Sequence, residues 1–237
     1  MDYSVIIPAH NEEHFLPATL AALAIAMENS AASGEVIVVD NASDDRTAQL
    51  ASASGARVIF EAHRQIARAR NVGAAAANGR FLVFLDADTL ISSSLLERAL
   101  EALASGSVCV GGATVDFGAA GRRHILPRVW NRISLAFKLA AGCFIYTHAE
   151  AHHAVGGFDE AYYASEEIWY VRRLKRWGKP RSMEARIFAD EPIRTSDRKL
   201  HMYSTRELLG LILLSALPFS VRSRRMCALW YDDRPKT

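Results

Sequence analysis

Cysteine is scarce in this chain. Only Cys109, Cys143 and Cys227 occur among 237 residues, and no two of them are closely spaced. Structural zinc sites need closely spaced ligands, and disulfide frameworks need several cysteines in a short chain. The sequence therefore predicts neither, and it fits a protein of a reducing compartment.

An excess of one charge and long apolar runs are also missing. The 28 lysines and arginines nearly balance the 26 aspartates and glutamates, for a formal net charge of +2. This balance argues neither for nor against an anionic partner, and we expect no nucleic-acid partner. No apolar run reaches the length of a bilayer span, and the N-terminus lacks the basic segment and apolar core of a signal peptide. We therefore expect a cytoplasmic protein.

One apolar stretch near the C-terminus nevertheless stands out. Leu208–Phe219 carries no charge, is too short to span a bilayer, and is followed by the basic segment Arg222–Arg225. An apolar helix with basic neighbours can lie in a membrane interface, here on the inner face of the membrane. The same helix can instead be buried in the core or in a dimer contact, and the sequence leaves these alternatives open.

Glycine-rich nucleotide motifs are absent too. Neither Gly-x-Gly-x-x-Gly nor Gly-x-x-x-x-Gly-Lys follows the first apolar segment, Ser4–Pro8, which disfavours a dinucleotide fold and a P-loop. Instead, short apolar segments alternate with amphipathic ones through the first 106 residues. This alternation predicts an α/β fold with a Rossmann-like, mostly parallel central sheet and helices on both faces.

The second half of the chain is less regular. Residues 107–117 predict one or two strands interrupted by Gly111-Gly112, and residues 124–141 predict an amphipathic helix with Trp130, Ile133 and Phe137 on one face. No repeat or low-complexity linker divides the chain. We therefore expect one domain over 1–237, with a nucleotide-binding half (1–106), an acceptor-binding half (107–204) and an apolar, basic helical tail (205–237).

Two carboxylates follow an apolar segment that predicts a buried strand. Phe81–Leu85 is continuously apolar, and Asp86 and Asp88 come directly after it. The next helix is expected to open with a capping box at Ser94–Glu97. Carboxylates one residue apart can share a cation at the carboxyl end of the sheet, where open α/β sheets bind ligands. Mg²⁺ or Mn²⁺ suits such ligands together with a substrate diphosphate.

A second pair of acids begins a helix predicted over 166–177. Glu167 shares a face with the apolar residues Leu174 and Trp177, so we expect it to face a cleft, where it can act as a general base. The alternative is an acid that stabilises the helix N-terminus.

Basic and imidazole side chains give weaker signals. Arg68 and Arg70, on the helix before Asp86, can reach phosphate or stay solvated. His152-His153 is expected in a surface turn, because its spacing to other candidate ligands matches no metal site.

Five segments together resemble the family 2 glycosyltransferases of GT-A fold and run in that family's order: SVIIPAHNEE at 4–13, EVIVVDNASDD at 35–45, ARARNVGAAAANGRFLVFLDADT at 67–89, VGGFDE at 155–160 and SEEIWYVRRLKRWG at 165–178. The resemblance implies an inverting, metal-dependent transfer of a sugar from a UDP- or GDP-linked donor. The implied acceptor is the hydroxyl of a saccharide, a lipid-linked molecule or a small molecule.

Site residues follow from the resemblance position by position. It assigns Pro8, Ala9, Asn11 and Glu12 to the nucleotide pocket, and Asp40 and Asn41 to the contact with the base. Arg70 is assigned to the diphosphate region, and Asp86, Ala87 and Asp88 form the Asp-x-Asp motif, in which Asp88 binds the metal with Asp86 beside it. Glu167 is assigned as the catalytic base. Asn41 replaces an acid that is usual there, and the family more often has aspartate at the base position. Arg198 and His201 lie where such folds often close over the phosphates.

Two other interpretations compete with this one. A nucleotidyltransferase of related fold should carry a glycine-rich, basic loop after its first strand, and the segment 8–15 is not of that kind. A non-catalytic, transferase-like membrane adaptor should have lost Asp88 or the acid at position 167, and both are present. The residues therefore favour an enzyme.

Overall fold

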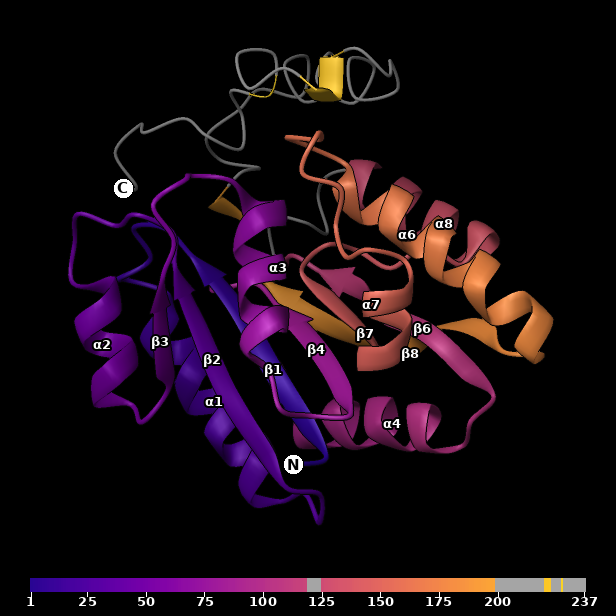
Figure 1. Ribbon diagram of the computed structural model, residues 1–237, viewed down its shortest axis with the longest axis horizontal. Coiled ribbons are helices and arrows are strands. Elements are labelled where there is room, and N and C mark those ends of the chain that lie inside the picture. The colour runs from indigo at the N-terminus through magenta and orange to yellow at the C-terminus, as the bar shows by residue number, and fades with distance from the viewer. Residues whose placement is uncertain (119–124, 199–219, 223–226, 228–237) are drawn as a thin grey trace.

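One mixed sheet organises the protein (Figure 1). The computed structural model describes residues 1–118, 125–198, 220–222 and 227. Its elements are β1 (Tyr3–Ala9), α1 (Leu16–Glu28), β2 (Gly34–Asp40), α2 (Thr47–Ala53), β3 (Arg57–Phe60), α3 (Ile66–Ala76), β4 (Phe81–Leu85), β5 (Thr89–Leu90), α4 (Ser93–Ala104), β6 (Val108–Asp116), α6 (Ile125–Phe137), β7 (Phe144–His148), α7 (Ala149–Ala154), α8 (Glu166–Gly178), β8 (Glu184–Thr195) and two short 3₁₀ turns, Lys179–Arg181 and Ser220–Arg222.

The two halves of the sheet differ in strand direction. The strand order is β3-β2-β1-β4-β7-β6-β8-β5, and β1 to β4 are all parallel. β7 runs antiparallel to β4 and to β6, and β5 runs antiparallel to β8. Side chains alternate with a period of two in either direction, so an apolar run cannot reveal strand direction. The predicted parallel sheet is therefore confirmed in the first half, and the second half is mixed.

Helices cover both faces of the sheet, as predicted. On one face, leucines of α1 and α4, such as Leu23 and Leu96, pack on β1 and β4. On the other face, α3 and α8 contribute Ala67, Tyr170 and Leu174. All five residues of β4 are buried, because this strand lies inside the sheet with helices above and below it. The continuous apolar run at 81–85 thus has the environment that its sequence predicts.

Three local predictions need correction. Helix α4 begins two residues earlier than predicted, because the Ser92 hydroxyl, rather than that of Ser94, caps it by accepting from the backbone N–H of Leu95 (3.1 Å). Strand β6 runs unbroken through Gly111-Gly112, because both glycines pair with β8, and the lack of a side chain at Gly111 leaves room for the ring of Tyr146. His152 lies in α7 and is only 4% exposed.

The correction at His152 has a simple cause. Its Nδ1 is hydrogen bonded to the Tyr170 hydroxyl (2.7 Å), which ties α7 to α8. The turn lies a few residues later, at Gly156 and Gly157, which both have positive φ. The predicted tail helix Leu208–Phe219, Arg224, Arg225 and His201 lie outside the described residues. Within the described part, no helix is long and apolar enough to cross a bilayer.

Candidate functional site

The predicted polar residues meet because three neighbouring strands end side by side. β1 lies between β2 and β4, so the loops after Ala9, Asp40 and Leu85 share one edge of the sheet. Those loops carry Asn11, Glu12, Asp86 and Asp88. The carboxyl ends of parallel strands are where α/β sheets place ligands, and the structure brings the predicted residues of the first half to this edge.

Hydrogen bonds lock the loops after β1 and β2 together. The N–H of Asn11, a residue with φ of 53°, donates to the Ser43 hydroxyl (3.1 Å), and the Asn11 side-chain oxygen accepts from the N–H of Asp44 (2.9 Å). Asp40 accepts from the N–H of Ser43 (3.1 Å). The two loops therefore form one preorganised wall beside Pro8 and Ala9.

Asn41 binds backbone on the far side of that wall. Its buried amide nitrogen donates to the carbonyl oxygens of Glu61 (3.0 Å) and His63 (2.7 Å), and its oxygen accepts from the N–H of Gln65 (2.9 Å). A carboxylate could make only the last of these bonds, because it cannot donate. The departure from an acid at this position thus has a structural reason: Asn41 holds the 61–65 loop against β2.

Arg70 is the centre of a buried ion cluster. It is 1% exposed, and its guanidinium donates to Glu166 (2.6 Å), Asp86 (3.0 Å) and the carbonyl oxygen of Gly142 (2.8 Å). Burial lowers the pKa of Arg70, but Asp86, Glu166 and Glu167 outweigh it and hold the pKa above its usual value. Arg70 therefore stays charged and ties α3, β4 and α8 together.

Glu167 lies beside this cluster. Its carboxyl carbon is 3.6 Å from where a Cβ on Gly142 would lie, and the Arg70 guanidinium is also adjacent to that position. Burial, followed by the negative charge of Glu166, raises the pKa of Glu167 to about 8, against the opposing effect of Arg70. The two adjacent acids thus have different environments: Glu166 forms an ion pair with Arg70, whereas the raised pKa of Glu167 favours its protonated form near neutral pH.

Hydrogen bonds to neighbouring elements fix the backbone of the turn at Asp86–Asp88. Ala87 is buried, and its carbonyl oxygen accepts a hydrogen bond from the Thr19 hydroxyl (2.8 Å) on α1. The N–H of Asp86 donates to the carbonyl oxygen of Cys143 (3.1 Å). Both flanks of the turn are thereby fixed, which sets the direction of the two carboxylates.

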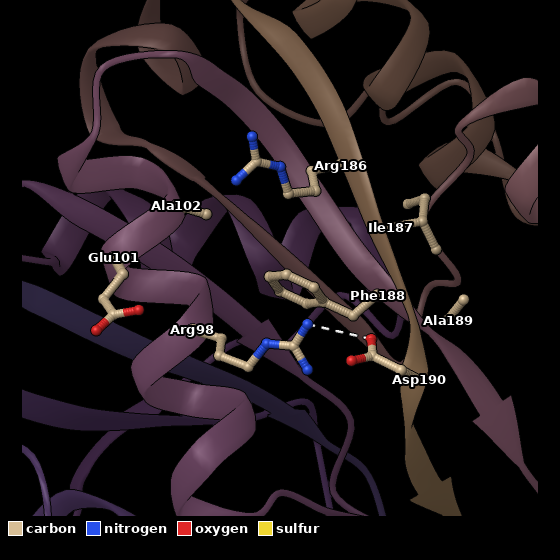
Figure 2. A pocket seen from close by; sticks show the side chains of 8 residues that line it. All are labelled: Arg98, Glu101, Ala102, Arg186, Ile187, Phe188, Ala189 and Asp190. Carbon is tan, nitrogen blue, oxygen red and sulfur yellow. Dashed lines mark hydrogen bonds and ion pairs between the residues drawn. The ribbon is translucent and has the colours of Figure 1, made fainter.

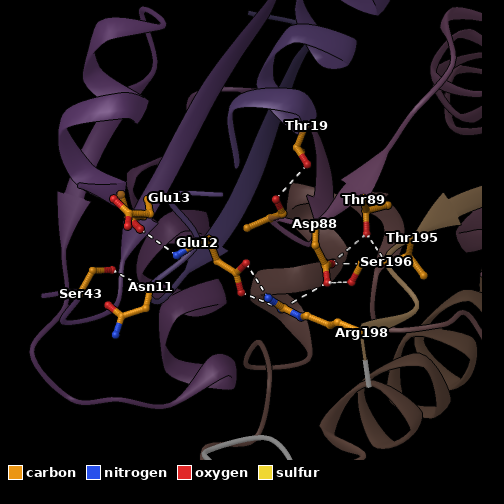
Figure 3. A network of polar contacts seen from close by, with 12 residues as sticks. Asn11, Glu12, Glu13, Thr19, Ser43, Asp88, Thr89, Thr195, Ser196 and Arg198 are labelled. Carbon is orange, nitrogen blue, oxygen red and sulfur yellow. Dashed lines mark hydrogen bonds and ion pairs between the residues drawn. The ribbon is translucent and has the colours of Figure 1, made fainter. Parts of the chain in front are cut away.

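A second arginine bridges Asp88 and Glu12 (Figure 3). Arg198 donates two parallel hydrogen bonds to the Glu12 carboxylate (2.8 and 2.7 Å) and lies 3.2 Å from Asp88 Oδ2. Thr195 and Ser196, at the end of β8, also donate to Asp88 (3.3 and 2.5 Å). Glu12 and Asp88, with the loops that carry them, form the acidic edge of the sheet. This acidic edge thus already holds one protein cation, Arg198.

The donor set at Asp88 suits a hard divalent cation. Its carboxylate faces a cluster of donors and a positive charge, which shows that the edge accommodates a cation. Among the described residues, no three His, Cys, Asp or Glu side chains form a ready-made metal site. Mg²⁺ and Mn²⁺ commonly use one or two carboxylates together with substrate phosphates and waters, so a third acid is not required beside Asp88. Asp86 is less suited, since Arg70 binds its Oδ1.

A separate cavity of about 500 Å³ lies between α4 and β8 (Figure 2). Arg98 crosses it, stacks on the Phe188 ring (4.4 Å to the centroid) and pairs with Asp190 (3.1 Å) and Glu191 (3.2 Å). The positive charge of Arg98 is therefore neutralised within the cavity, and none of the residues that line this cavity belongs to the predicted site.

Sequence reasoning missed two contributors to the acidic edge, Thr195 and Ser196, and one to the Arg70 cluster, Glu166. Thr195 and Ser196 carry no motif, and Glu166 was distinguishable from Glu167 only by its partner. Their common feature is distance along the chain, since each binds a residue about a hundred positions away. Arg198 and its partners Glu12 and Asp88 each had a signal through the family resemblance, but their pairing did not.

Known proteins resemble this chain in sequence and in structure. Residues 4–165 match the family model described as glycosyl transferase family 2. The uncharacterized glycosyltransferase EpsJ of Bacillus subtilis is 27% identical over 129 residues, which cover 52% of this chain and 37% of that protein. Escherichia coli WfgD, a UDP-Glc:alpha-D-GlcNAc-diphosphoundecaprenol beta-1,3-glucosyltransferase, is 28% identical over 109 residues, or 44% of this chain and 42% of that protein. The matches thus span less than half of either relative.

A solved structure extends the likeness to nearly the whole chain. The mannosyltransferase PcManGT from Pyrobaculum calidifontis, in complex with GDP-Man and Mn²⁺, superimposes with a TM-score of 0.69 over 93% of this chain and 64% of that one. The identity is 20%, so this likeness establishes the fold alone.

Proposed function

The chain belongs to glycosyltransferase family 2 and has the GT-A fold, and on this basis we propose that it is an inverting glycosyltransferase that moves a sugar from a nucleotide-diphosphate sugar to an acceptor hydroxyl. One observation supports the proposal: Asp88, which pairs with the Arg198 cation, lies two residues from Asp86, and Arg70 ties Asp86 to Glu166, the neighbour of Glu167, a carboxyl with a raised pKa.

The donor would bind along the loops after β1, β2 and β4. Pro8, Ala9 and Asp40 line the wall that the Asn11 and Ser43 contacts make rigid, and a preformed wall lowers the ordering cost of binding a nucleotide. UDP- and GDP-linked donors are both candidates, since WfgD is named for UDP-Glc and PcManGT was solved with GDP-Man.

Asp88 would hold Mg²⁺ or Mn²⁺ with the diphosphate. When bound, the metal supplies positive charge to the leaving diphosphate. Metal binding at Asp88 would require Arg198 to leave its contact with Asp88. Arg198 would remain paired with Glu12. Asp86, on the buried Arg70 side, would orient the turn rather than bind the metal directly.

Glu167 would act as the general base. Its deprotonated carboxylate takes the proton of the acceptor hydroxyl, the oxygen bonds to the anomeric carbon, and the bond from that carbon to the diphosphate breaks on the opposite face. One displacement of this kind inverts the configuration. A raised pKa makes Glu167 a stronger base once it is ionised, and it leaves the carboxyl largely protonated at lower pH.

Donor binding provides the first test. We expect Mn²⁺ to tighten the binding of UDP or GDP in calorimetry, and Asp88→Asn to remove that enhancement. Asp190→Asn is the matched control, because Asp190 is a carboxylate at the α4–β8 cavity, outside the proposed site. Equal metal enhancement in Asp88→Asn and in the unaltered chain would refute the metal role.

Turnover provides the second test. Glu167→Gln should retain nucleotide affinity and lose turnover by about 10²–10⁴-fold, the usual contribution of a general base. In the unaltered chain, the rate should rise with pH toward about 8, as Glu167 ionises. Donor-sugar hydrolysis, followed through release of UDP or GDP, measures both without a known acceptor. An active Glu167→Gln variant would contradict the assignment.

The acceptor and the location stay predictions. A saccharide, a lipid-linked molecule or a small molecule remains the expected acceptor class, and the name of WfgD includes a diphosphoundecaprenol acceptor. We retain a cytoplasmic location, on the inner face of the membrane if the chain binds one.

A further inference from the structure

Helix α6 exposes apolar side chains to solvent. Val129, Ile133 and Phe137 recur every four residues and therefore share one side of the helix. They are 42%, 39% and 64% exposed, and Leu135 on the same helix is 40% exposed. The described residues expose only three other large apolar side chains, and those are scattered over the first 60 residues. The exposed apolar surface is thus concentrated on α6.

Polar contacts explain why this helix does not turn its apolar side inward. The Asn131 side chain bonds to both the N–H and the carbonyl oxygen of Val115 (3.0 and 2.9 Å), as a neighbouring strand would. Ser134 is buried and donates to the carbonyl oxygen of Leu139 (2.6 Å). These bonds fix the rotation of α6 on β6, so the predicted face of Trp130, Ile133 and Phe137 buries only its Trp130 edge.

A cationic groove adjoins the end of this apolar stripe. Lys175 on α8 donates to the carbonyl oxygen of Phe137 (2.8 Å), so the last turn of α6 touches α8. There a cavity of about 480 Å³ is lined by Met183, Ala185, one acid and five cations, namely Glu184 with Lys138, Arg172, Lys175, Arg176 and Lys179. The two helices lie side by side at the upper right of Figure 1.

The cations of the groove outnumber their partners. Glu184 pairs with Lys138 (2.7 Å), whereas Arg172, Arg176 and Lys179 are exposed and pair with no carboxylate of the described residues. Arg172 lies over the ring of Trp169 (5.0 Å to the centroid). With a formal net charge of only +2 for the whole chain, this groove is a local concentration of positive charge rather than a reflection of composition.

We propose that the outer side of α6 and the groove of α8 form a docking surface for an anionic lipid bilayer. The groove takes the phosphates of the headgroups, and Val129, Ile133 and Phe137 enter the boundary between headgroups and acyl chains. The pairing of an apolar helix side with basic and aromatic neighbours is the chemistry of an interfacial helix. Complementarity of charge favours an anionic membrane over a second copy of this chain, which would bring two positive grooves together.

The surface is joined to the proposed active site by both helices. α8 begins at Glu166-Glu167 and carries the groove in its last turns. α6 leads through Leu139–Ala141 to Gly142, whose carbonyl oxygen binds Arg70. A bilayer held by these helices would therefore lie next to the acceptor half, which suits a lipid-carried acceptor. That last consequence rests on the proposed function, whereas the docking itself does not.

The test is co-sedimentation of the full chain with vesicles of phosphatidylcholine containing about one third phosphatidylglycerol, at low salt. We expect binding to these vesicles, little binding to pure phosphatidylcholine, and release at high salt. Two double variants, Arg172→Glu with Arg176→Glu and Ile133→Asp with Phe137→Asp, should each lower the partition coefficient about tenfold or more. The single change Phe137→Ser serves if a double variant does not fold.

Matched controls lie elsewhere on the surface. Phe60→Asp alters an exposed apolar residue on β3, at the other end of the sheet, and Arg80→Glu alters an exposed cation before β4. Both should bind vesicles as the unaltered chain does. Because no turnover is measured, failure here leaves the proposed glycosyl transfer untouched.

Four outcomes would overturn the proposal. The first is that the unaltered chain does not bind anionic vesicles, and the second is that the control variants lose binding equally. The third is that binding survives both double variants but is lost in Leu214→Asp of the tail. The fourth is that the chain self-associates, and that Ile133→Asp with Phe137→Asp abolishes this self-association while vesicle binding persists. The last outcome would assign the surface to a second copy.

Discussion

Two arginines each bridge two carboxylates, on opposite sides of the Asp86–Asp88 turn. Arg70 joins Asp86 to Glu166 and is 1% exposed. Arg198 joins Asp88 to Glu12, and its side chain is 20% exposed. The two bridges have the same composition and comparable distances, and they differ mainly in the burial of the arginine and in the described elements that carry them.

Burial gives the two bridges different roles. Removing Arg70 would leave Glu166 charged in a place that water hardly reaches, whereas removing Arg198, which is itself 20% exposed, would open Glu12 and Asp88 to water. An uncompensated buried charge is costly, and an accessible one is solvated. Arg70 is therefore a permanent part of the framework, whereas Arg198 is the cation that we propose a ligand displaces. The proposed function would thus assign neighbouring carboxylates of one motif to different roles, Asp86 to the framework and Asp88 to binding.

The largest expected effect is on Arg70. Arg70→Gln should lower the free energy of unfolding by about 3–5 kcal/mol, because it leaves Glu166 buried without a cation. Urea unfolding near neutral pH measures this loss. Adding Glu166→Gln to the same variant should recover part of it, since no buried charge then remains. A loss below about 1 kcal/mol, the value of an exposed pair, would show that the buried bridge is not stabilising.

A smaller effect of opposite sign is expected at Glu167. Its pKa in the folded protein is about 8, above the ordinary 4.5, so the folded state binds this proton more tightly than the unfolded state does. The unfolded chain releases the proton first as pH rises, and stability is lost between about pH 4.5 and pH 8. Glu167→Gln removes this titration and should stabilise the protein by about 1–2 kcal/mol near pH 8.

The pH dependence is the control for that prediction. The difference between Glu167→Gln and the unaltered chain should shrink toward zero below about pH 5, where the carboxyl is protonated in the folded state and increasingly in the unfolded state. Thermal unfolding at both pH values measures it. A difference that does not change with pH would mean that Glu167 is not protonated in the folded protein.

The smallest effect is expected at Arg198. Arg198→Gln should cost about 1 kcal/mol, because loss of this partly exposed arginine lets water reach Glu12 and Asp88, whose side chains are 9% and 12% exposed beside it. The same variant should bind Mn²⁺ more tightly in the absence of nucleotide, since Arg198 no longer competes for Asp88. Urea unfolding and calorimetry with Mn²⁺ alone measure the two effects. A loss as large as that of Arg70→Gln would remove the distinction between the two bridges.

Much of the first half could be predicted because its signals are local. The apolar run at 81–85 and the acids after it define a buried strand and a polar end without reference to any other segment. The cap of α4 was displaced to Ser92 because several serines precede that helix, and only their positions in space decide which one caps it. His152 was assigned to a surface turn for a similar reason, since its partner, Tyr170, lies on another helix.

Local sequence patterns are enough to locate the ends of the strands and the side chains that stand there, because backbone geometry imposes the same alternation on any apolar run. The partners of these side chains depend on the three-dimensional arrangement: Glu166 for Arg70, Glu12 and Asp88 for Arg198, and Val115 for Asn131. Each of these pairings depends on the order and direction of strands in the sheet, which side-chain periodicity does not record. The same contacts decided that α6 turns its apolar stripe outward, since a few buried hydrogen bonds outweighed the pattern of its own sequence.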